Sequence, residues 1–345
     1  MLETAQVNLT TEISEFGETL PVPEVPEKLQ IDFHGLCNLK CPKCIVHGEA
    51  NTEGIKFPQR FMSLEEARQI LDEVTGVKTY IEPQLWNEPL LRPLEFRQQL
   101  AEIKKRNMAA VFNTNGLLMT NELAKFFVEI QLDSVSVSID AHTPETLIKV
   151  RATDKLDKIR EAVWMMLRAR EEESYPRIGV SFTVEEENKH ELDDFIAYWI
   201  KYVDVVRVNQ LYADGMYHNT PTPEQRVPCH LLYQSMAIQS NGDVPICCLD
   251  GLGQTKMGNV FKDGVKGVWH GEEFRKIRHY HETNQYDQVP FCKTCDNWAN
   301  YRIIEETIVD DMLVRRYAGT TYYNRIDRLS SWKGGSVTDQ SPVKI

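Results

Sequence analysis

The chain has 345 residues, 42% hydrophobic and 26% charged, and a formal net charge of −12. This negative charge argues against a nucleic-acid partner, because proteins that bind phosphate backbones need basic surfaces. No apolar run is long enough to span a membrane, and the acidic N-terminus lacks the basic start and apolar core of a signal peptide. We therefore expect a cytoplasmic protein whose eight cysteines ligate metal rather than form disulfides.

The first part of the chain predicts an α/β fold. Residues 1–27 form an expected N-terminal arm, and from 28 to 224 short apolar runs alternate with helical stretches, as in a parallel sheet. The expected strands are 29–34, 78–82, 110–115, 134–139, 178–183 and 204–209. The expected helices are 63–74, 92–106, 120–130, 144–150, 155–173 and 189–201, the first with a Ser63/Glu66 capping box. Six strands at this spacing predict a partial (β/α)6 TIM-like barrel.

The second part of the chain has a different composition. Glycines become frequent and five cysteines appear over 225–300, which predicts a smaller, cysteine-rich domain. The remainder, 301–345, is expected to contain a helix, covering about 297–317, and then a polar tail.

Polar and apolar side chains alternate along most of the predicted strands. Gln30, Asp32 and His34 alternate with Ile31 and Phe33, and other strands repeat the pattern at 113–115, 134–140, 181–183 and 207–209. Because strand side chains alternate faces, each strand would turn a polar face away from the helices. A polar lumen is costly to bury unless something polar fills it. We therefore predict a barrel that holds a polar cofactor and a polar substrate; the alternative is an open edge that faces water.

Three cysteines follow the first predicted strand in the run CNLKCPKC: Cys37, Cys41 and Cys44. Most [4Fe–4S] clusters take four cysteines, so three would leave one iron open to a substrate or cofactor. The alternatives are a zinc site, with His34 or His47 as the fourth ligand, and a disulfide pair.

The spacing CxxxCxxC resembles the signature of radical S-adenosylmethionine (SAM) enzymes. The resemblance implies that the open iron binds the amino and carboxylate groups of SAM. It also implies that an electron from the cluster cleaves SAM to methionine and a 5′-deoxyadenosyl radical, which takes a hydrogen atom from the substrate. Lys43 replaces an aromatic residue that is usual in the family, and we interpret this as the mark of a subgroup.

Three further stretches resemble the SAM-binding segments of this family. WNEPL at 86–90 corresponds to the GGEP loop, although both glycines are replaced; NTNG at 113–116 corresponds to its TNG strand end. SID at 138–140, followed by Arg151, resembles the stretch that contacts the SAM ribose and carboxylate, and an arginine can bind a carboxylate bidentately. The implied cofactor contacts are Asn87, Glu88, Asn115, Ser138, Asp140 and Arg151.

The later cysteines, with the accompanying NGD and MGNV patterns, resemble the C-terminal SPASM/twitch domains of radical SAM enzymes. They are too few for the two clusters of a full SPASM domain, so the resemblance implies the twitch form with one auxiliary [4Fe–4S] cluster. Its implied ligands are Cys229, Cys247, Cys292 and Cys295. Cys248 could replace Cys247, and a structural zinc site with four cysteines is the alternative.

A cluster saturated by cysteines cannot bind a substrate through iron, so its expected task is electron transfer. The cysteine spacing is similar to that of the 2-deoxy-scyllo-inosamine dehydrogenase group of aminoglycoside biosynthesis, and related enzymes act on nucleoside antibiotic precursors. The resemblance implies oxidation of a secondary alcohol to a ketone in a sugar, aminocyclitol or nucleoside-type precursor, with flavodoxin or ferredoxin as electron donor. The alternatives are a decarboxylase, an epimerase, a ribosomal-peptide maturase and a non-catalytic cluster- or zinc-bearing scaffold.

Polar residues of the predicted lumen that SAM does not use are candidates for substrate chemistry. A base is needed to deprotonate the substrate, and we consider His34, Glu82 and, less usually, Arg207. Asp32, Asn209 and Tyr212 are the expected substrate contacts.

Overall fold

The structure is a computed structural model that describes residues 21–331 apart from 53, 55–56, 214–215, 218–225 and 301–302. Its strands are β1 (Lys28–Ile31), β2 (Tyr80–Glu82), β3 (Ala109–Thr114), β4 (Ser134–Ser138), β5 (Arg177–Val184), β6 (Val205–Gln210), β7 (Tyr212–Ala213), β8 (Met216–Tyr217), β9 (Ser235–Ile238), β10 (Asp243–Val244), β11 (Gly258–Asn259), β12 (Glu305–Val309), β13 (Met312–Arg316) and β14 (Thr320–Arg325). Its helices are α1 (Leu64–Glu73), α2 (Pro93–Lys105), α3 (Asn121–Glu129), α4 (Pro144–Arg151), α5 (Leu156–Arg170), α6 (Leu192–Trp199), α7 (Leu231–Gln234), α8 (Val260–Trp269), α9 (Glu272–Glu282) and α10 (Pro290–Lys293).

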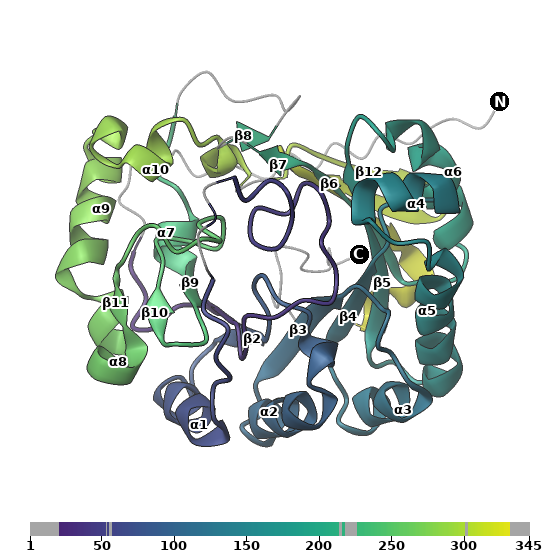
Figure 1. The fold of residues 1–345 in the computed structure, drawn as a ribbon, viewed down its shortest axis with the longest axis horizontal. Coiled ribbons are helices and arrows are strands. Elements are labelled where there is room, and N and C mark those ends of the chain that lie inside the picture. Colours follow the sequence, from purple (N-terminus) through teal and green to yellow (C-terminus); the bar gives the residue numbers. More distant parts are fainter. Residues whose placement is uncertain are drawn as a thin grey trace.

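Strands β1 to β6 pair in parallel and in chain order, which confirms the predicted partial barrel. Helices α1, α2, α3 and α5 follow one another along the outside of the curved sheet (Figure 1). The segment between β1 and α1 crosses the open middle of the barrel in the same view. None of the helices within the described ranges has the length and apolar character needed to cross a bilayer.

Local sequence explains where the first helix begins. Ser63 caps α1 through a hydrogen bond from Glu66 N to Ser63 Oγ (3.2 Å), and Glu66 Oε2 accepts from Ser63 N (2.8 Å). This is the capping box predicted from the sequence. The buried face of the helix (Ala67, Ile70 and Leu71) then lies against the sheet side of the core.

The core lies between the sheet and its helices, and the polar faces of the strands turn to the other side. Val135 and Val137 of β4 are fully buried, whereas the three serines that alternate with them are only partly buried. Phe112 of β3 packs edge-to-face on Phe96 of α2, with ring centroids 5.0 Å apart. The predicted alternation is thus present: apolar residues face the helices and polar residues line the concave face.

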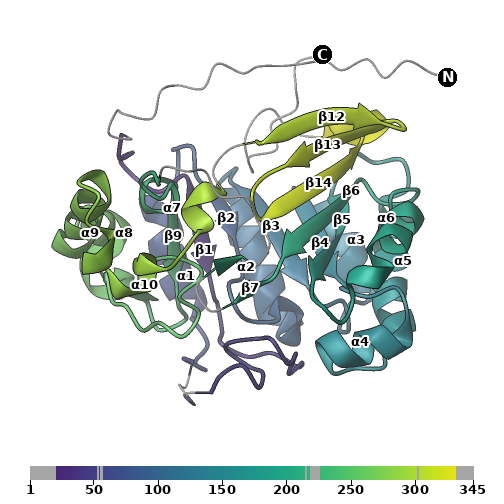
Figure 2. The same ribbon diagram turned by 90° about the horizontal axis from the view of Figure 1, so that it is seen from above.

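The sheet continues beyond the barrel on both sides. Strand β9 of the second part of the chain pairs in parallel with β1, and β14 pairs antiparallel with β6. Strands β12, β13 and β14 form an antiparallel meander that extends the sheet past β6 (Figure 2).

The predicted helix over about 297–317 is wrong, because the second half of that segment forms β12 and β13. The two strands are joined at Asp310 and Asp311, whose φ angles are +47° and +60°. Two consecutive positive φ values are typical of the tight hairpin turns whose twist suits antiparallel strands. The predicted tail beyond residue 331 and most of the predicted arm, residues 1–20, lie outside the described residues.

Candidate active site

The three cysteines of the first motif lie in a tight loop directly after β1. Cys44 N donates to Cys41 O (2.9 Å) and Gly48 N donates to Cys44 O (3.0 Å). A side chain at Gly48 would place its Cβ only 1.9 Å from Cys41 O, so the loop needs glycine there to close. The loop therefore holds Cys37, Cys41 and Cys44 on one short stretch of backbone.

The thiols of this loop are electrostatically suited to a metal cluster. Burial, together with the neighbouring charges of Glu88, Cys41 and Cys44, raises the pKa of Cys37 to about 12, against the opposing effect of the Leu39 backbone amide. Burial also raises the pKa of Cys41, while Arg151 lowers it. Such thiols remain protonated unless a cation compensates their charge, which is what ligated iron does.

Asp32 holds the loop that corresponds to the GGEP segment. Its Oδ1 accepts hydrogen bonds from Leu85 N (2.6 Å) and Trp86 N (3.1 Å). Burial raises its pKa to about 7, against the opposing effect of these backbone amides. The side chain is fully buried and its carboxylate orients the loop, so the substrate contact expected of Asp32 stays a prediction.

Glu88 joins the same loop to two other parts of the site. Its carboxylate accepts from Thr114 Oγ1 (2.6 Å) and Asn115 N (2.7 Å) at the end of β3. Its backbone N donates to Leu36 O (2.9 Å), immediately before Cys37. Glu88 thus fixes the ends of β1, β2 and β3 relative to one another.

Two asparagines complete this side of the site. Asn115 Nδ2 donates to Asn38 Oδ1 (2.8 Å), which lies within the cysteine loop. The Asn87 amide is buried, and neither of its polar atoms has a hydrogen-bond partner among the described residues. Because a buried amide without partners is costly, Asn87 is suited to bind a polar group that enters here, such as SAM.

An ion pair lies at the end of β4. Arg151 Nε donates to Asp140 Oδ2 (2.8 Å), and Asp140 Oδ1 accepts from Thr183 N (2.7 Å). Burial lowers the pKa of Arg151, but the charges of Asp140, Cys41 and Cys37 more than offset this and raise it. The guanidinium is therefore fixed beside the cysteine loop, where a carboxylate of SAM could bind. Ser138, the remaining predicted contact, accepts from Ser181 Oγ (3.3 Å).

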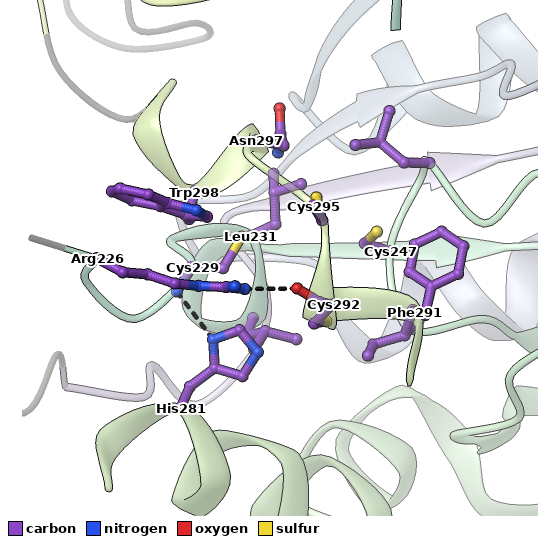
Figure 3. Close-up of a pocket in the computed structure, with 13 residues that line it drawn as sticks. Arg226, Cys229, Leu231, Cys247, His281, Phe291, Cys292, Cys295, Asn297 and Trp298 are labelled. Atoms are coloured by element: carbon purple, nitrogen blue, oxygen red, sulfur yellow. Dashed lines mark hydrogen bonds between the residues drawn. The ribbon is translucent and has the colours of Figure 1, made fainter. Parts of the chain in front are cut away.

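The second cysteine set surrounds one cavity. The cysteines that line it are Cys229, Cys247, Cys292 and Cys295, the four ligands favoured above (Figure 3). Burial raises the pKa of Cys292 to about 12, and the pKa values of the other three are raised for the same reason. A cavity lined by four buried thiols fits a cluster that supplies the compensating positive charge.

Cys248 does not line this cavity. Burial raises the pKa of its thiol, and the charges of Glu82 and Cys295 raise it too, while Lys28 lowers it. Of these two adjacent cysteines, only Cys247 thus lines the cavity.

The remaining predicted residues are dispersed over the concave face. Arg207 Nη2 on β6 donates to Asn113 Oδ1 on β3 (2.7 Å), which spans the face. Glu82 Oε2 lies 3.8 Å from Lys28 Nζ. Asn209 Oδ1 accepts from Thr320 Oγ1 of β14 (3.4 Å).

Two predicted residues have other surroundings than expected. His34 is buried against Phe61, with ring centroids 5.5 Å apart, and its Nδ1 accepts from Leu36 N (3.2 Å). Burial lowers its pKa to about 4. His34 is thus packed against Phe61 and bonded to Leu36 N, and its role as a base stays a prediction. Tyr212 was expected to contact the substrate. Its hydroxyl instead donates to Cys295 Sγ of the auxiliary cavity (3.1 Å).

Trp86 and Arg226 are functional candidates that the sequence reasoning missed. Trp86 Nε1 donates to Cys248 O (2.9 Å), and Trp86 O contacts His47 Nε2 (2.9 Å). Trp86 thus connects the cysteine loop after β1 with the auxiliary cysteines. Arg226 donates to Cys292 O (2.6 Å) beside the cavity. The only sequence signal for Trp86 was that a tryptophan replaces the glycine that is usual in the family. No sequence pattern indicated Arg226.

Two family models match the chain. The model described as "Radical SAM superfamily" matches residues 31–198, and the model for SPASM, an iron-sulfur cluster-binding domain, matches residues 229–296. These matches cover both cysteine sets. They imply a SAM-binding [4Fe–4S] cluster, an auxiliary cluster and SAM as cofactors, which is consistent with the two thiol sites and the unpaired Asn87 amide.

Curated relatives are similar to this chain over part of their length. The tungsten-containing aldehyde ferredoxin oxidoreductase cofactor-modifying protein of Pyrococcus furiosus is 29% identical over 216 residues, which cover 56% of this chain and 57% of that protein. Mycofactocin maturase MftC of Mycobacterium tuberculosis is 24% identical over 224 residues, which cover 61% of this chain and 54% of that protein. The chain thus spans little more than half the length of these relatives.

Among solved structures, BtrN in complex with AdoMet and 2-DOIA has a TM-score of 0.54 to this chain at 14% identity. The superposition covers 80% of this chain and 94% of BtrN. At this identity the likeness concerns the fold: a barrel followed by a cysteine-rich domain.

Proposed function

Because this chain belongs to the radical SAM superfamily and carries a SPASM domain, we propose that it oxidises a secondary alcohol of a polar small molecule to a ketone. The substrate would be a sugar, aminocyclitol or nucleoside-type precursor in natural-product (antibiotic) biosynthesis. The observation that carries this proposal is the cavity lined by four cysteines. Four thiolates would saturate the auxiliary cluster, which leaves it electron transfer rather than substrate ligation as a task.

The proposal assigns the cofactors as follows. Cys37, Cys41 and Cys44 would hold the SAM-binding cluster, and the four cysteines of the cavity would hold the auxiliary one. When bound, SAM and the two clusters would supply hydrogen-atom abstraction and the removal of one further electron. Asn87, Asn115 and the Asp140–Arg151 pair would orient SAM; Arg151 would bind its carboxylate.

The chain itself would position the substrate and take its proton. Arg207 spans the concave face to Asn113 and offers N–H donors to a substrate hydroxyl or carboxylate. We retain Glu82 as the candidate base, because its carboxylate lies on the concave face beside Lys28 and could take the proton of the reacting hydroxyl. An arginine does not give up its proton in proteins, so Arg207 is better suited to orientation than to base catalysis.

The electron for SAM cleavage would come from a flavodoxin- or ferredoxin-type donor, and we place the protein in the cytoplasm. The similarity to BtrN, whose structure is a complex with AdoMet and 2-DOIA, supports a cyclitol-like substrate. The similarity to MftC keeps a peptide substrate as the alternative.

A second candidate function, epimerisation, is favoured by the position of Cys248. Cys248 is not among the residues that line the cavity of the other cysteines, and the charges of Lys28 and Glu82 act on its thiol. A substrate carbon radical could take the hydrogen atom of this S–H group. The resulting sulfur radical would then need one electron and one proton, which the flavodoxin- or ferredoxin-type donor and solvent would supply.

The test uses anaerobically reconstituted full-length protein with SAM, a reductant and a panel of sugars, aminocyclitols and nucleosides. The measured quantities are 5′-deoxyadenosine and the product mass, with Cys37→Ala as the matched inactive variant. A substrate-stimulated product that has lost two hydrogens supports the oxidation. Loss of carbon dioxide, or an isomer of unchanged mass that incorporates solvent deuterium and disappears in Cys248→Ala, refutes it in favour of a decarboxylase or an epimerase. Absence of cleavage with every small molecule, but cleavage with peptides, refutes it in favour of a maturase.

A further inference from the structure

Tyr212 contacts the auxiliary site from the end of a barrel strand. It lies on β7, which follows β6 closely in the chain, and its hydroxyl donates to Cys295 Sγ over 3.1 Å. Cys295 lines the cavity together with the other three cysteines (Figure 3). The hydroxyl therefore contacts the sulfur that would ligate iron, rather than only the surrounding backbone.

Arg226 places a positive charge at the same cavity. Its Nη2 donates to Cys292 O (2.6 Å) and its Nη1 to Lys293 O (3.2 Å). The guanidinium carbon lies 4.0 Å from the centroid of the Tyr286 ring and 5.9 Å from that of Trp298. Figure 3 shows Arg226 beside Trp298 at the edge of the cavity. These four partners carry no charge, so they hold the guanidinium in place without neutralising it.

A hydrogen bond and a nearby cation act on a cluster in the same direction. Reduction adds one electron, so the reduced cluster is the more negative form. A donor to a ligand sulfur and a positive charge both stabilise that form more than the oxidised one, which raises the reduction potential. In most cluster sites backbone N–H groups donate such hydrogen bonds. Here the donor is a tyrosine side chain, so a substitution by phenylalanine removes the hydrogen bond and only one oxygen atom.

We propose that Tyr212 and Arg226 are positioning residues that raise the reduction potential of the auxiliary cluster and so make it an electron acceptor. This deepens the proposed oxidation, because only an acceptor can take the second electron from the substrate. Tyr212 follows β6, the strand that bears Arg207 on the concave face. Its hydrogen bond to Cys295 therefore connects the end of this strand with the auxiliary site.

The experiment measures the midpoint potential of the auxiliary cluster in full-length protein. The parent is a Cys37→Ala, Cys41→Ala, Cys44→Ala triple variant, in which only the auxiliary cluster can assemble, so that one potential is observed by EPR-monitored titration. Tyr212→Phe removes only the hydroxyl, Arg226→Gln removes the charge and Arg226→Lys keeps it. Tyr233→Phe is the control, because the Tyr233 hydroxyl donates to Glu282 (2.8 Å) instead of to a cysteine.

We expect more negative potentials in Tyr212→Phe and Arg226→Gln, a smaller shift in Arg226→Lys and none in Tyr233→Phe. Replacement of Tyr212 by 3-fluorotyrosine, whose hydroxyl is a stronger donor, should shift the potential in the positive direction. This keeps the test valid if Tyr212→Phe fails to assemble its cluster. Unchanged potentials in variants with normal iron and sulfide content would overturn the proposal. The measurement needs no substrate, so its result is independent of whether the protein oxidises an alcohol.

Discussion

The indole Nε1 of Trp86 donates a hydrogen bond to the backbone oxygen of Cys248 over 2.9 Å. Trp86 belongs to the loop that Asp32 orients, and Cys248 follows a cysteine of the auxiliary cavity. Gly251 packs against the same indole, where an added Cβ would lie 2.6 Å from Cε2 of Trp86. One side chain thus connects the predicted SAM-binding loop with the auxiliary domain.

Replacing Trp86 by Phe should loosen this connection, because the aromatic ring remains while the N–H donor is lost. A hydrogen bond of this kind contributes about 1 kcal/mol, which corresponds to roughly fivefold faster amide exchange in locally opened segments. We expect that acceleration at residues 247–254, measured by hydrogen–deuterium exchange with mass spectrometry. Trp164→Phe is the control, since Trp164 packs on Tyr202 far from either cysteine set. Equal exchange in Trp86→Phe and the parent would contradict the connection.

Cys247 and Cys248 should differ in their effect on iron content, because only Cys247 lines the auxiliary cavity. Cys247→Ala is expected to lose the auxiliary cluster, about four irons per chain, and Cys248→Ala to keep both clusters. Iron and sulfide analysis together with EPR of the reduced proteins measures this. The reverse result would exchange the roles of the two residues.

Arg151→Lys should weaken SAM binding, because a lysine cannot bind a carboxylate and Asp140 with a planar fork. We expect roughly a tenfold increase in Kd, about 1.4 kcal/mol, from equilibrium binding to the reconstituted protein. The matched control is Arg160→Lys on α5, whose Nη2 donates to His142 O (2.6 Å). A tighter or unchanged Kd in Arg151→Lys, with an intact cluster, would exclude the proposed carboxylate contact.

The buried carboxyl of Asp32 should make stability depend on pH. Its pKa is raised from 3.8 to about 7, chiefly by burial. The folded state therefore binds this proton more tightly than the unfolded state, so stability is greatest at low pH and falls as pH rises through about 7. Between the pKa of 3.8 and that of about 7, the free energy of unfolding should fall by about 1.4 kcal/mol per pH unit.

Asp32→Asn should lack this contribution, so its urea midpoint relative to the parent should rise between pH 5.5 and pH 7 and level off above. Asp72→Asn, at a largely exposed position, is the comparison variant. If the difference between Asp32→Asn and the parent is the same at all pH values, the raised pKa is refuted.

Much of the barrel could be predicted because its strands and helices carry strong local signals. The period-two alternation in β4 and the Ser63 cap of α1 are examples, and both concern neighbouring residues. The segment from 297 to 317 failed because its hydrophobic pattern is compatible with a helix. Its strand form depends on the Asp310–Asp311 turn and on β14, which pairs with the distant β6.

The cysteines and the strand-end residues of the site could also be identified, because motif order along the chain is preserved in the fold. Three aspects could not be derived. The direction of Cys247 and Cys248 is a matter of backbone geometry between adjacent identical residues. Asp32 and His34 alternate correctly with apolar neighbours, but a backbone amide of another segment uses the Asp32 carboxylate, and the nearby Leu36 N uses His34 Nδ1. Arg226 reaches the cavity through contacts with residues that lie far along the chain.

The pairing of β9 with β1 affects how such a protein can be rearranged by recombination or engineering. Asp32 N also donates to Ile238 O (2.9 Å), so the auxiliary domain contributes a strand to the sheet that starts the barrel. A fragment that ends at residue 224 would expose an unpaired edge of β1, which invites aggregation. The distance between the two cysteine sites is likewise set by a hydrogen-bonded ladder rather than by a linker. A chimera that exchanges one domain with a relative would have to preserve the pairing of β1 with β9. The barrel and the auxiliary domain should therefore be exchanged together, as one sheet.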